Sequence, residues 1–208
     1  MILHIEGNIG AGKSTFIEAL SKLLPWINIE YEKLDEWRNV GGVDLFNVYY
    51  NNPEKFGFHF EVVVLSTRIK TEHRITETAK NHLVVMERSM YSEKIFARYL
   101  FEKKFPITYN CYCKLHEMWE TLKPADLEER YVYLTTPPDV CMNNIKKRNR
   151  KGEENITMEF LEELDKLHHE TFCSLSLKDK VLVVPWKDCQ WETQIFDDSN
   201  NILEFLFC

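Results

Sequence analysis

The apolar positions of the chain form short unbroken runs separated by longer stretches of helical periodicity. Strands are predicted for five apolar, β-rich runs, at residues 2–5, 27–31, 83–86, 131–134 and 181–184. The first three are almost continuously apolar, which is typical of strands covered on both faces of a sheet. Helical patterns lie at residues 13–24, 53–79, 91–101, 109–122, 138–149 and 157–175. Because strands alternate with helices, we expect an α/β fold with a five-stranded parallel sheet flanked by helices.

Composition narrows the class of protein. The 208 residues suffice for one packed core and contain no repeat or linker, so we expect one domain over residues 1–208. The formal net charge of −7 argues against nucleic acid as a partner. No apolar run approaches about 18 residues and the chain starts with a predicted strand, so we expect neither a membrane span nor a secretory signal. Six scattered cysteines without CxxC spacing indicate free thiols and a cytoplasmic protein.

The strongest chemical motif directly follows the first predicted strand. The stretch GNIGAGKS fits the pattern GxxxxGK[ST] between a strand and a helix, whereas the dinucleotide pattern GxGxxG fails at Ile9. Its glycines let backbone N–H groups surround a phosphate, Lys13 adds a point charge, and Ser14 can bind Mg²⁺. We predict a loop over residues 7–15 that binds ATP. Its residues are Gly7, Asn8, Ile9, Gly10, Ala11, Gly12, Lys13, Ser14 and Thr15.

A carboxylate and a cation follow the third predicted strand. Residues 83–86 lead directly into Glu87, Arg88 and Ser89. A carboxylate at the end of a buried strand suits a second ligand for Mg²⁺, beside Ser14. The neighbouring Arg88 can stabilise charge on a moving phosphoryl group, although a salt bridge to Glu87 is the structural alternative. A guanine-specific switch should carry an NKxD loop, and the sequence contains none. These residues therefore favour phosphoryl transfer.

With these motifs the chain resembles the deoxyribonucleoside kinase family, which includes deoxycytidine, deoxyguanosine, mitochondrial thymidine and insect multisubstrate kinases. The resemblance runs to about residue 186. It rests on GNIGAGKSTF, Glu32 five residues before WRNV, YNNP at 50–53, FHFE at 58–61 with Arg68 seven residues later, ERSMYSE at 87–93, and RNR at 148–150 before Glu153. It implies a P-loop kinase fold, transfer of the ATP γ-phosphate to the 5′-OH of a deoxynucleoside, and a homodimer.

The resemblance implies the catalytic roles. Glu32 matches the base that takes the proton of the 5′-OH, with Arg88 holding that hydroxyl or the phosphate and Lys13 on the phosphates. Arg148 and Arg150 match two arginines of a basic lid, over about residues 144–155, that closes on ATP. Asn144 occupies the position of the family's third lid arginine. The role of that arginine could pass to Lys146 or Lys147.

The resemblance also implies an acceptor site. Tyr50 and Glu153 match the pair that binds the sugar 3′-OH, and Trp37 and Phe60 match rings that sandwich the base. Taken alone, such residues are usually surface or core side chains. Tyr91 and Phe101 suit the core equally well.

The base itself is expected to meet Glu61, at a position where the family carries glutamine. An ionised carboxylate only accepts hydrogen bonds, and guanine presents two donors side by side. Glu61 therefore favours deoxyguanosine, unless it is protonated or neutralised by Arg68. Arg68 and Glu93 match the Arg and Asp of cytidine- and guanosine-directed members, which disfavours thymidine. We expect deoxyguanosine or deoxycytidine, with broad or thymidine specificity as alternatives.

Two other functions stay open from the sequence. A nucleoside monophosphate kinase, such as thymidylate kinase, would share the loop and the lid, but the Glu32 carboxylate would repel the acceptor's phosphate. A regulator that binds nucleotides without catalysis is disfavoured because Lys13, Glu32, Arg88 and the lid are all present.

Two smaller expectations concern helix surfaces. His116, His168 and His169 are expected on the surface or partly buried, without forming a metal site. Apolar stripes that include Val63, Ile69, Ile95 and Tyr99 suit either a dimer interface or packing against the sheet.

Overall fold

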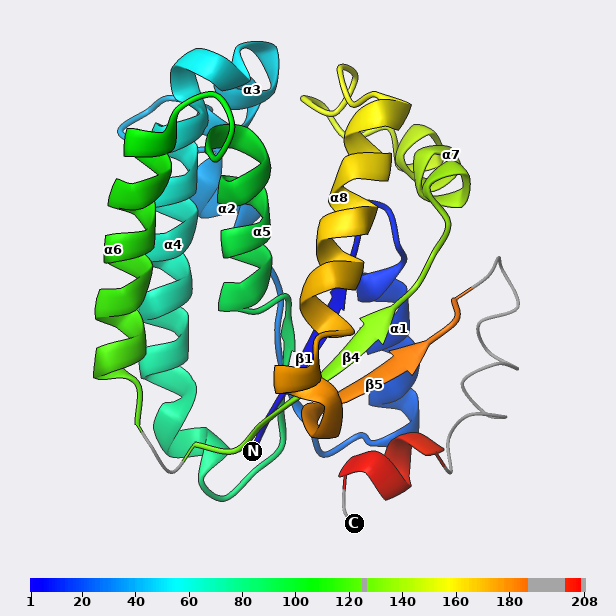
Figure 1. Cartoon of the computed structure of the whole chain (residues 1–208). Coiled ribbons are helices and arrows are strands. Elements are labelled where there is room, and N and C mark those ends of the chain that lie inside the picture. Colours follow the sequence, from blue (N-terminus) through cyan, green and yellow to red (C-terminus); the bar gives the residue numbers. More distant parts are fainter. Residues whose placement is uncertain (125–126, 187–200, 207–208) are drawn as a thin grey trace.

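The computed structural model describes residues 1–124, 127–186 and 201–206 and is built around one sheet (Figure 1). The strands of these residues run in the order β2-β3-β1-β4-β5, and every pairing is parallel. They are β1 (Ile2–Gly7), β2 (Asn28–Glu30), β3 (Val84–Glu87), β4 (Glu129–Leu134) and β5 (Val181–Val184). The predicted α/β fold with a five-stranded parallel sheet is confirmed.

Helices fill the connections between the strands. They are α1 (Lys13–Leu23), α2 (Leu34–Trp37), α3 (Leu45–Asn51), α4 (Pro53–Ala79), α5 (Met90–Phe101), α6 (Pro106–Leu122), α7 (Pro138–Arg148) and α8 (Met158–Phe172), followed by a 3₁₀ helix, η1 (Leu175–Lys180). Local sequence sets several starts: the side chains of Asn52, Ser89 and Thr157 cap α4, α5 and α8. None of the described helices is both long and apolar enough to cross a lipid bilayer.

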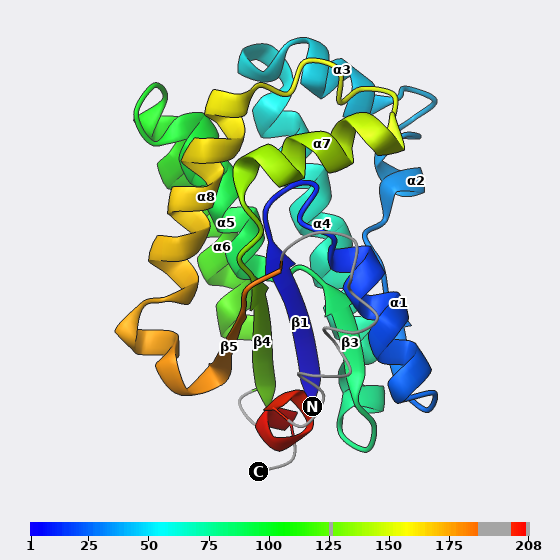
Figure 2. The same ribbon diagram turned by 90° about the vertical axis from the view of Figure 1, so that its right-hand side faces the viewer.

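The alternation of side chains along β1 divides the core into two layers. Leu3 and Ile5 pack with Phe16 and Ile17 of α1 on one face of the sheet. Ile2 points to the other face and packs with Ile75 of α4. Figures 1 and 2 show α1 on one side of the sheet and α4, α5 and α6 on the other. The carboxyl ends of β1, β3 and β4 therefore lie between these layers, beneath α7 (Figure 2).

Two sequence expectations need correction. The second strand was expected to be covered on both faces, but β2 is a short edge strand in which Asn28 is exposed and Ile29 and Glu30 are half-buried. The helices α2 and α3 were not predicted, because each is too short to show helical periodicity. Both precede α4 and carry Trp37, Tyr49 and Tyr50 to one end of the sheet.

The expected dimer stripe is also partly core. Ile95 is buried with Tyr131 and Tyr133 of β4, so packing against the sheet explains its apolar character. Tyr99 packs on Phe160 of α8, with 4.7 Å between ring centroids.

Candidate active site

The predicted phosphate-binding loop is a tight turn between β1 and α1. Gly10 and Gly12 have φ angles of 77° and 89°, in the left-handed region that favours glycine. A Cβ atom at Gly10 would lie 2.4 Å from the carbonyl oxygen of Cys141. These two positions therefore require glycine for the loop to pass beneath α7.

Lys13 is buried at the start of α1 and folds back over the loop. Its Nζ donates to the carbonyl oxygens of Asn8, at 2.9 Å, and Gly7, at 3.3 Å. Burial lowers the pKa of Lys13 to about 8, and the charge of Arg88 acts in the same direction. An anion beside this ammonium group would stabilise its positive charge, as water would if the group were exposed.

Ser14 and Glu87 place two oxygen ligands side by side. The Ser14 hydroxyl donates to Glu87 Oε1 over 3.1 Å. Burial raises the pKa of Glu87, and the nearby Glu32 carboxylate raises it further. Hydroxyl and carboxylate oxygens with excess negative charge fit Mg²⁺, which usually takes few protein ligands and completes its shell with phosphate oxygens and water. The described residues contain no cluster of three or more His, Cys, Asp or Glu side chains suited to a metal ion.

Arg88 forms an ion pair with Glu32 at the centre of the site. Its Nε lies 2.8 Å from Glu32 Oε1, and its Nη1 donates to the Gly7 carbonyl oxygen over 3.0 Å. The guanidinium carbon is 4.9 Å from the centre of the Phe96 ring. Arg88 has a φ of 65°, an unusual conformation for a residue other than glycine. Arg88 thus pairs with Glu32, in contrast to the pairing with Glu87 that was the structural alternative.

The charge around Glu32 keeps this carboxyl ionised. Burial acts to raise the pKa of Glu32, but the positive charges of Arg88, Lys13 and Arg68 outweigh it, and the net shift is downward. Glu32 is therefore a carboxylate at neutral pH and can accept a proton.

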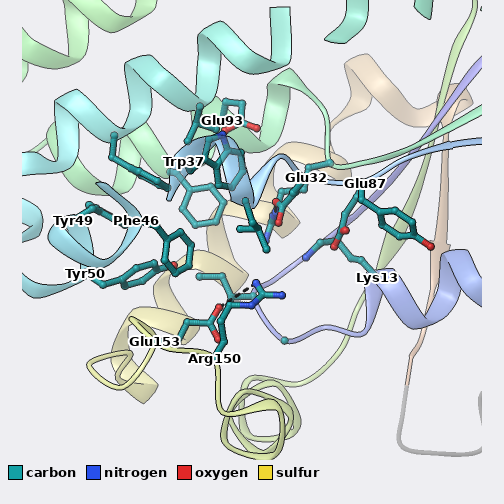
Figure 3. A pocket seen from close by; sticks show the side chains of 18 of the residues that line it. Lys13, Glu32, Trp37, Phe46, Tyr49, Tyr50, Glu87, Glu93, Arg150 and Glu153 are labelled. Carbon is teal, nitrogen blue, oxygen red and sulfur yellow. Dashed lines mark hydrogen bonds and ion pairs between the residues drawn. The ribbon is translucent and has the colours of Figure 1, made fainter. Parts of the chain in front are cut away.

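A cavity of about 220 Å³ opens beside this ion pair (Figure 3). It is lined by nearly all the residues predicted to bind the acceptor: Glu32, Trp37, Tyr50, Phe60, Glu61, Arg88, Glu93 and Glu153. Arg68 lies behind this lining, where its Nε and Nη2 donate to Glu93 Oε1 over 3.1 and 2.9 Å. The structure therefore brings together residues from α2, α3, α4, α5 and the lid.

A second cavity adjoins the first. Its lining contains Gly12, Thr15, Asn144, Lys147 and Trp186, and the two cavities share six residues: Gly10, Lys13, Ser14, Glu87, Arg148 and Arg150. A phosphoryl group beside Lys13 can therefore face both spaces.

The aromatic wall differs from the expected sandwich. Trp37 and Phe60 contact each other edge to face, with 5.7 Å between centroids and 84° between planes. This contact leaves no gap for a base between them, so they form one wall. Tyr49 stacks on Phe60 at 4.5 Å, and Phe96 also lines the cavity. Tyr49 and Phe96 were missed because nothing in their spacing distinguishes them from core aromatics.

The lid is tied to the proposed sugar end of the cavity. Glu153 is buried and accepts from Arg148 Nη2 and Nε over 2.7 and 2.9 Å, and from Arg150 over 3.4 Å. Burial and the Glu153 charge raise the pKa of Tyr50. Asn144 donates to the Gly10 carbonyl oxygen over 2.9 Å, so it binds the loop where the family pattern has an arginine.

His168 is a site residue that the sequence analysis missed. His168 and His116 were expected at or near the surface, but their exposed fractions are 0% and 2%. His168 Nδ1 lies 2.7 Å from the Leu164 carbonyl oxygen and must donate to it, which leaves Nε2 to accept from Arg88 Nη1 at 3.4 Å. The burial of His168 could have been predicted from helical spacing, because it shares the buried face of α8 with Leu161, Leu164 and Phe172.

Together, the fold and the two adjoining cavities define a phosphotransferase that uses a nucleoside triphosphate. A family model described as deoxynucleoside kinase matches residues 3–205, and the chain belongs to this family. It is therefore an ATP-dependent deoxynucleoside kinase, as the sequence resemblance predicted.

Known relatives place the chain within the family without choosing the base. Deoxycytidine kinase 1 of Xenopus laevis is 33% identical over 198 residues, covering 81% of this chain and 74% of that protein. The deoxyadenosine kinase of Dictyostelium discoideum is 29% identical over 189 residues, covering 89% and 72%. A structure of deoxyadenosine kinase from M. mycoides with dCMP and dCDP has the same fold, with a TM-score of 0.79, 24% identity, and coverage of 98% and 100%.

The burial of His168 predicts a loss of stability in acid. Burial lowers its pKa to about 3, with Arg88 acting in the same direction, whereas an unfolded histidine titrates near about 6.5. As the pH falls between these values the unfolded chain binds a proton that the folded chain does not. From about pH 6.5 to about pH 5 this should remove about 2 kcal/mol of folding free energy.

Urea unfolding of His168→Gln at both pH values measures this contribution. The variant should lose about 2 kcal/mol less than the wild type over the interval, while His59→Gln, on an exposed position of α4, should follow the wild type. Equal losses in His168→Gln and the wild type would contradict the assignment.

Proposed function

We propose that this kinase transfers the γ-phosphate of ATP to the 5′-OH of a deoxynucleoside, with Glu32 as the general base. The observation that carries the proposal is the 2.8 Å ion pair of Glu32 with Arg88, in the wall of the acceptor cavity and next to Lys13. An ionised carboxylate there can take the hydroxyl proton as the oxygen attacks phosphorus.

The chain's own charges suit the transition state. In phosphoryl transfer, negative charge spreads over the equatorial oxygens of the moving group, and catalysis consists largely of positioning and charge stabilisation. Lys13 would bind the phosphates, and Arg88 would hold the 5′-oxygen or the moving phosphoryl group. Arg148 and Arg150, which line both cavities, would stabilise the same charge and exclude water.

Mg²⁺ is the expected cofactor. Ser14 and Glu87 would hold it, because their oxygens already lie 3.1 Å apart in the wall shared by the two cavities. When bound, the ion would offset the negative charge of the triphosphate.

The acceptor's other groups have candidate partners. The phenol of Tyr50 and the carboxylate of Glu153 would bind the sugar 3′-OH, which can both donate and accept. The base would lie against the Trp37–Phe60 wall near Glu61. Family membership argues against the monophosphate kinase and the regulator that the sequence left open.

We also propose a homodimer that uses α6. Three large apolar side chains on this helix, Ile107, Met118 and Leu122, are 79%, 53% and 70% exposed. Their spacing of 11 and 4 residues places them on one face, and α6 lies beside α4 at the margin of the molecule (Figure 1). A two-fold interface between copies would cover this stripe.

Two broader expectations stay predictions, namely one domain over residues 1–208 and a cytoplasmic location. Cys111, Cys113, Cys141 and Cys173 are free thiols, which is compatible with a reducing compartment, while Cys189 and Cys208 lie outside the described residues.

Glu32→Gln tests the proposed base. Without a proton acceptor, kcat with a deoxynucleoside should fall by roughly 10²- to 10⁴-fold, with little change in ATP binding. The matched control is Glu30→Gln, because Glu30 pairs with Lys33 and Arg74 away from the cavity. Near-wild-type turnover in Glu32→Gln would rule out this role.

The lowered pKa of Lys13 predicts proton uptake when ATP binds. Near pH 8 about half of the Lys13 side chains are neutral, and phosphates beside Nζ should restore the charge. Titration calorimetry with Mg–ATP in two buffers of different ionisation enthalpy should show uptake of up to about half a proton at about pH 8 and less at about pH 7. Lys13→Arg, which stays charged, should show none; persistent uptake in this variant would contradict the assignment.

Leu122→Glu tests the dimer. A charge in the apolar stripe should halve the mass in solution, measured by light scattering after gel filtration. Val43→Glu, at a position 51% exposed in a loop, should leave the mass unchanged. Equal masses for Leu122→Glu and the wild type would refute an interface at α6.

A further inference from the structure

Glu61 is a buried carboxyl group that the catalytic mechanism does not use. It lies on α4, is 2% exposed and lines the acceptor cavity. Its Oε2 is buried without a hydrogen-bond partner. A polar atom buried in this way normally has a partner, so the Glu61 carboxyl lacks the hydrogen bonds that would stabilise an ionised form.

The buried arginine seven residues after Glu61 on α4 is already engaged. Arg68 donates through Nε and Nη2 to Glu93 Oε1, and through Nη1 to the Glu87 carbonyl oxygen over 2.8 Å. Arg88 is paired with Glu32. Among the described residues, no ion pair or hydrogen bond reaches the Glu61 carboxyl. Neutralisation by Arg68, one of the two exceptions considered from the sequence, does not occur.

The groups that face Glu61 leave one way to balance its charge. They are Glu93 on α5, Tyr112 on α6, Tyr49 on α3 and Arg88 after β3. The hydroxyl of Tyr112 is itself buried without a partner, and Glu93 adds a second carboxyl group. Because a buried carboxylate without a counter-ion is costly, such a group takes up a proton instead.

We infer that Glu61 reads the nucleobase as a neutral carboxylic acid, donating one hydrogen bond and accepting another. The inference rests on the proposed function, since it assumes that a nucleoside occupies this cavity. Cytosine and adenine each present an amino donor beside a ring-nitrogen acceptor, and a neutral carboxyl group matches that pair as an amide does.

This protonation state changes the expected acceptor. An ionised Glu61 would suit guanine, whose N1–H and N2–H₂ are adjacent donors, and would face the ring nitrogen of cytosine or adenine with a second acceptor. The neutral group removes that conflict. The proton can also sit on either oxygen, so the order of donor and acceptor can reverse without rotation of the side chain. Deoxycytidine and deoxyadenosine are therefore substrates at neutral pH.

Base preference should then depend on pH. The pKa of Glu61 is raised well above its usual range, first by burial and then by Glu93, while Arg88 acts in the opposite direction. Below this raised pKa the carboxyl group donates, and above it the group only accepts. The ratio of kcat/KM for deoxycytidine to that for deoxyguanosine should fall as the pH rises.

A competition assay measures this ratio directly. Deoxycytidine and deoxyguanosine are mixed with Mg–ATP, and the two monophosphates are quantified at pH values from about 6 to about 9. The wild-type ratio should fall by about tenfold or more as the pH rises. When Glu61 loses its proton, its oxygen and the ring nitrogen of cytosine are two buried acceptors without a donor between them. In Glu61→Gln, which has no carboxyl group at this position, this fall of the ratio with pH should be lost.

A matched control separates Glu61 from other buried carboxyls. Burial raises the pKa of Glu72 to about 7, and Glu72 lies on the same helix outside the cavity. Glu72→Gln should keep the wild-type pH profile. The loss of the profile in Glu72→Gln, or its persistence in Glu61→Gln, would overturn the inference.

An infrared difference spectrum gives a readout that is independent of turnover. The wild type at neutral pH should show the C=O stretch of a protonated carboxyl that Glu61→Gln lacks. This band would support the inference even if the ratio stayed flat in favour of deoxycytidine, and its absence would overturn it. A protein that shows the band but phosphorylates no deoxynucleoside would refute the proposed function instead.

Discussion

The ion pair between Arg88 and Glu32 is the contact on which the rest of the site depends. The Arg88 guanidinium bonds the phosphate-binding loop at Gly7, faces Phe96 of α5 and approaches His168 of α8. One cation therefore joins β1, the segment after β2, the end of β3 and two helices at the carboxyl edge of the sheet. Its left-handed backbone conformation costs on the order of 1–3 kcal/mol, which a buried ion pair with good geometry can offset.

Around this pair, the partners of each buried carboxyl group decide its protonation state. Burial acts to raise the pKa of Glu129, but His4 and Lys123 outweigh it and hold the pKa at about 2. Glu32 behaves in the same way because Arg88, Lys13 and Arg68 surround it. Glu61 and Glu72 are more deeply buried than these two and have weaker compensation, and the pKa of each is raised. The same type of side chain thus has a lowered pKa in one place and a raised pKa in another.

The sequence predicted those parts of the molecule that local pattern determines. The loop after β1, the parallel sheet and the convergence of Glu32 and Arg88 follow from motifs placed at strand ends, where open α/β sheets bind ligands, whereas the place of Glu153 was implied by the family resemblance. Tertiary contacts decide what the sequence did not reveal. An edge position exposes β2, and the contact of Trp37 with Phe60 turns an expected sandwich into one wall. His168 could have been found from its helical spacing, but its tautomer depends on the contact with Leu164.

The residues proposed for chemistry and for base recognition come from different elements but line one cavity. The reacting groups lie at strand ends and in the loop, whereas α4 carries Glu61, Arg68 and Thr67, whose hydroxyl accepts from Trp37 Nε1 over 2.9 Å. This helix of 27 residues therefore holds the carboxyl group proposed to read the base, and Thr67 fixes the indole of the aromatic wall beside it. Arg68 also couples this helix to the reacting groups, because it donates to the Glu87 carbonyl oxygen and its charge lowers the pKa of Glu32. Relatives of this chain are named for different bases, as expected where specificity resides in the site that the fold positions.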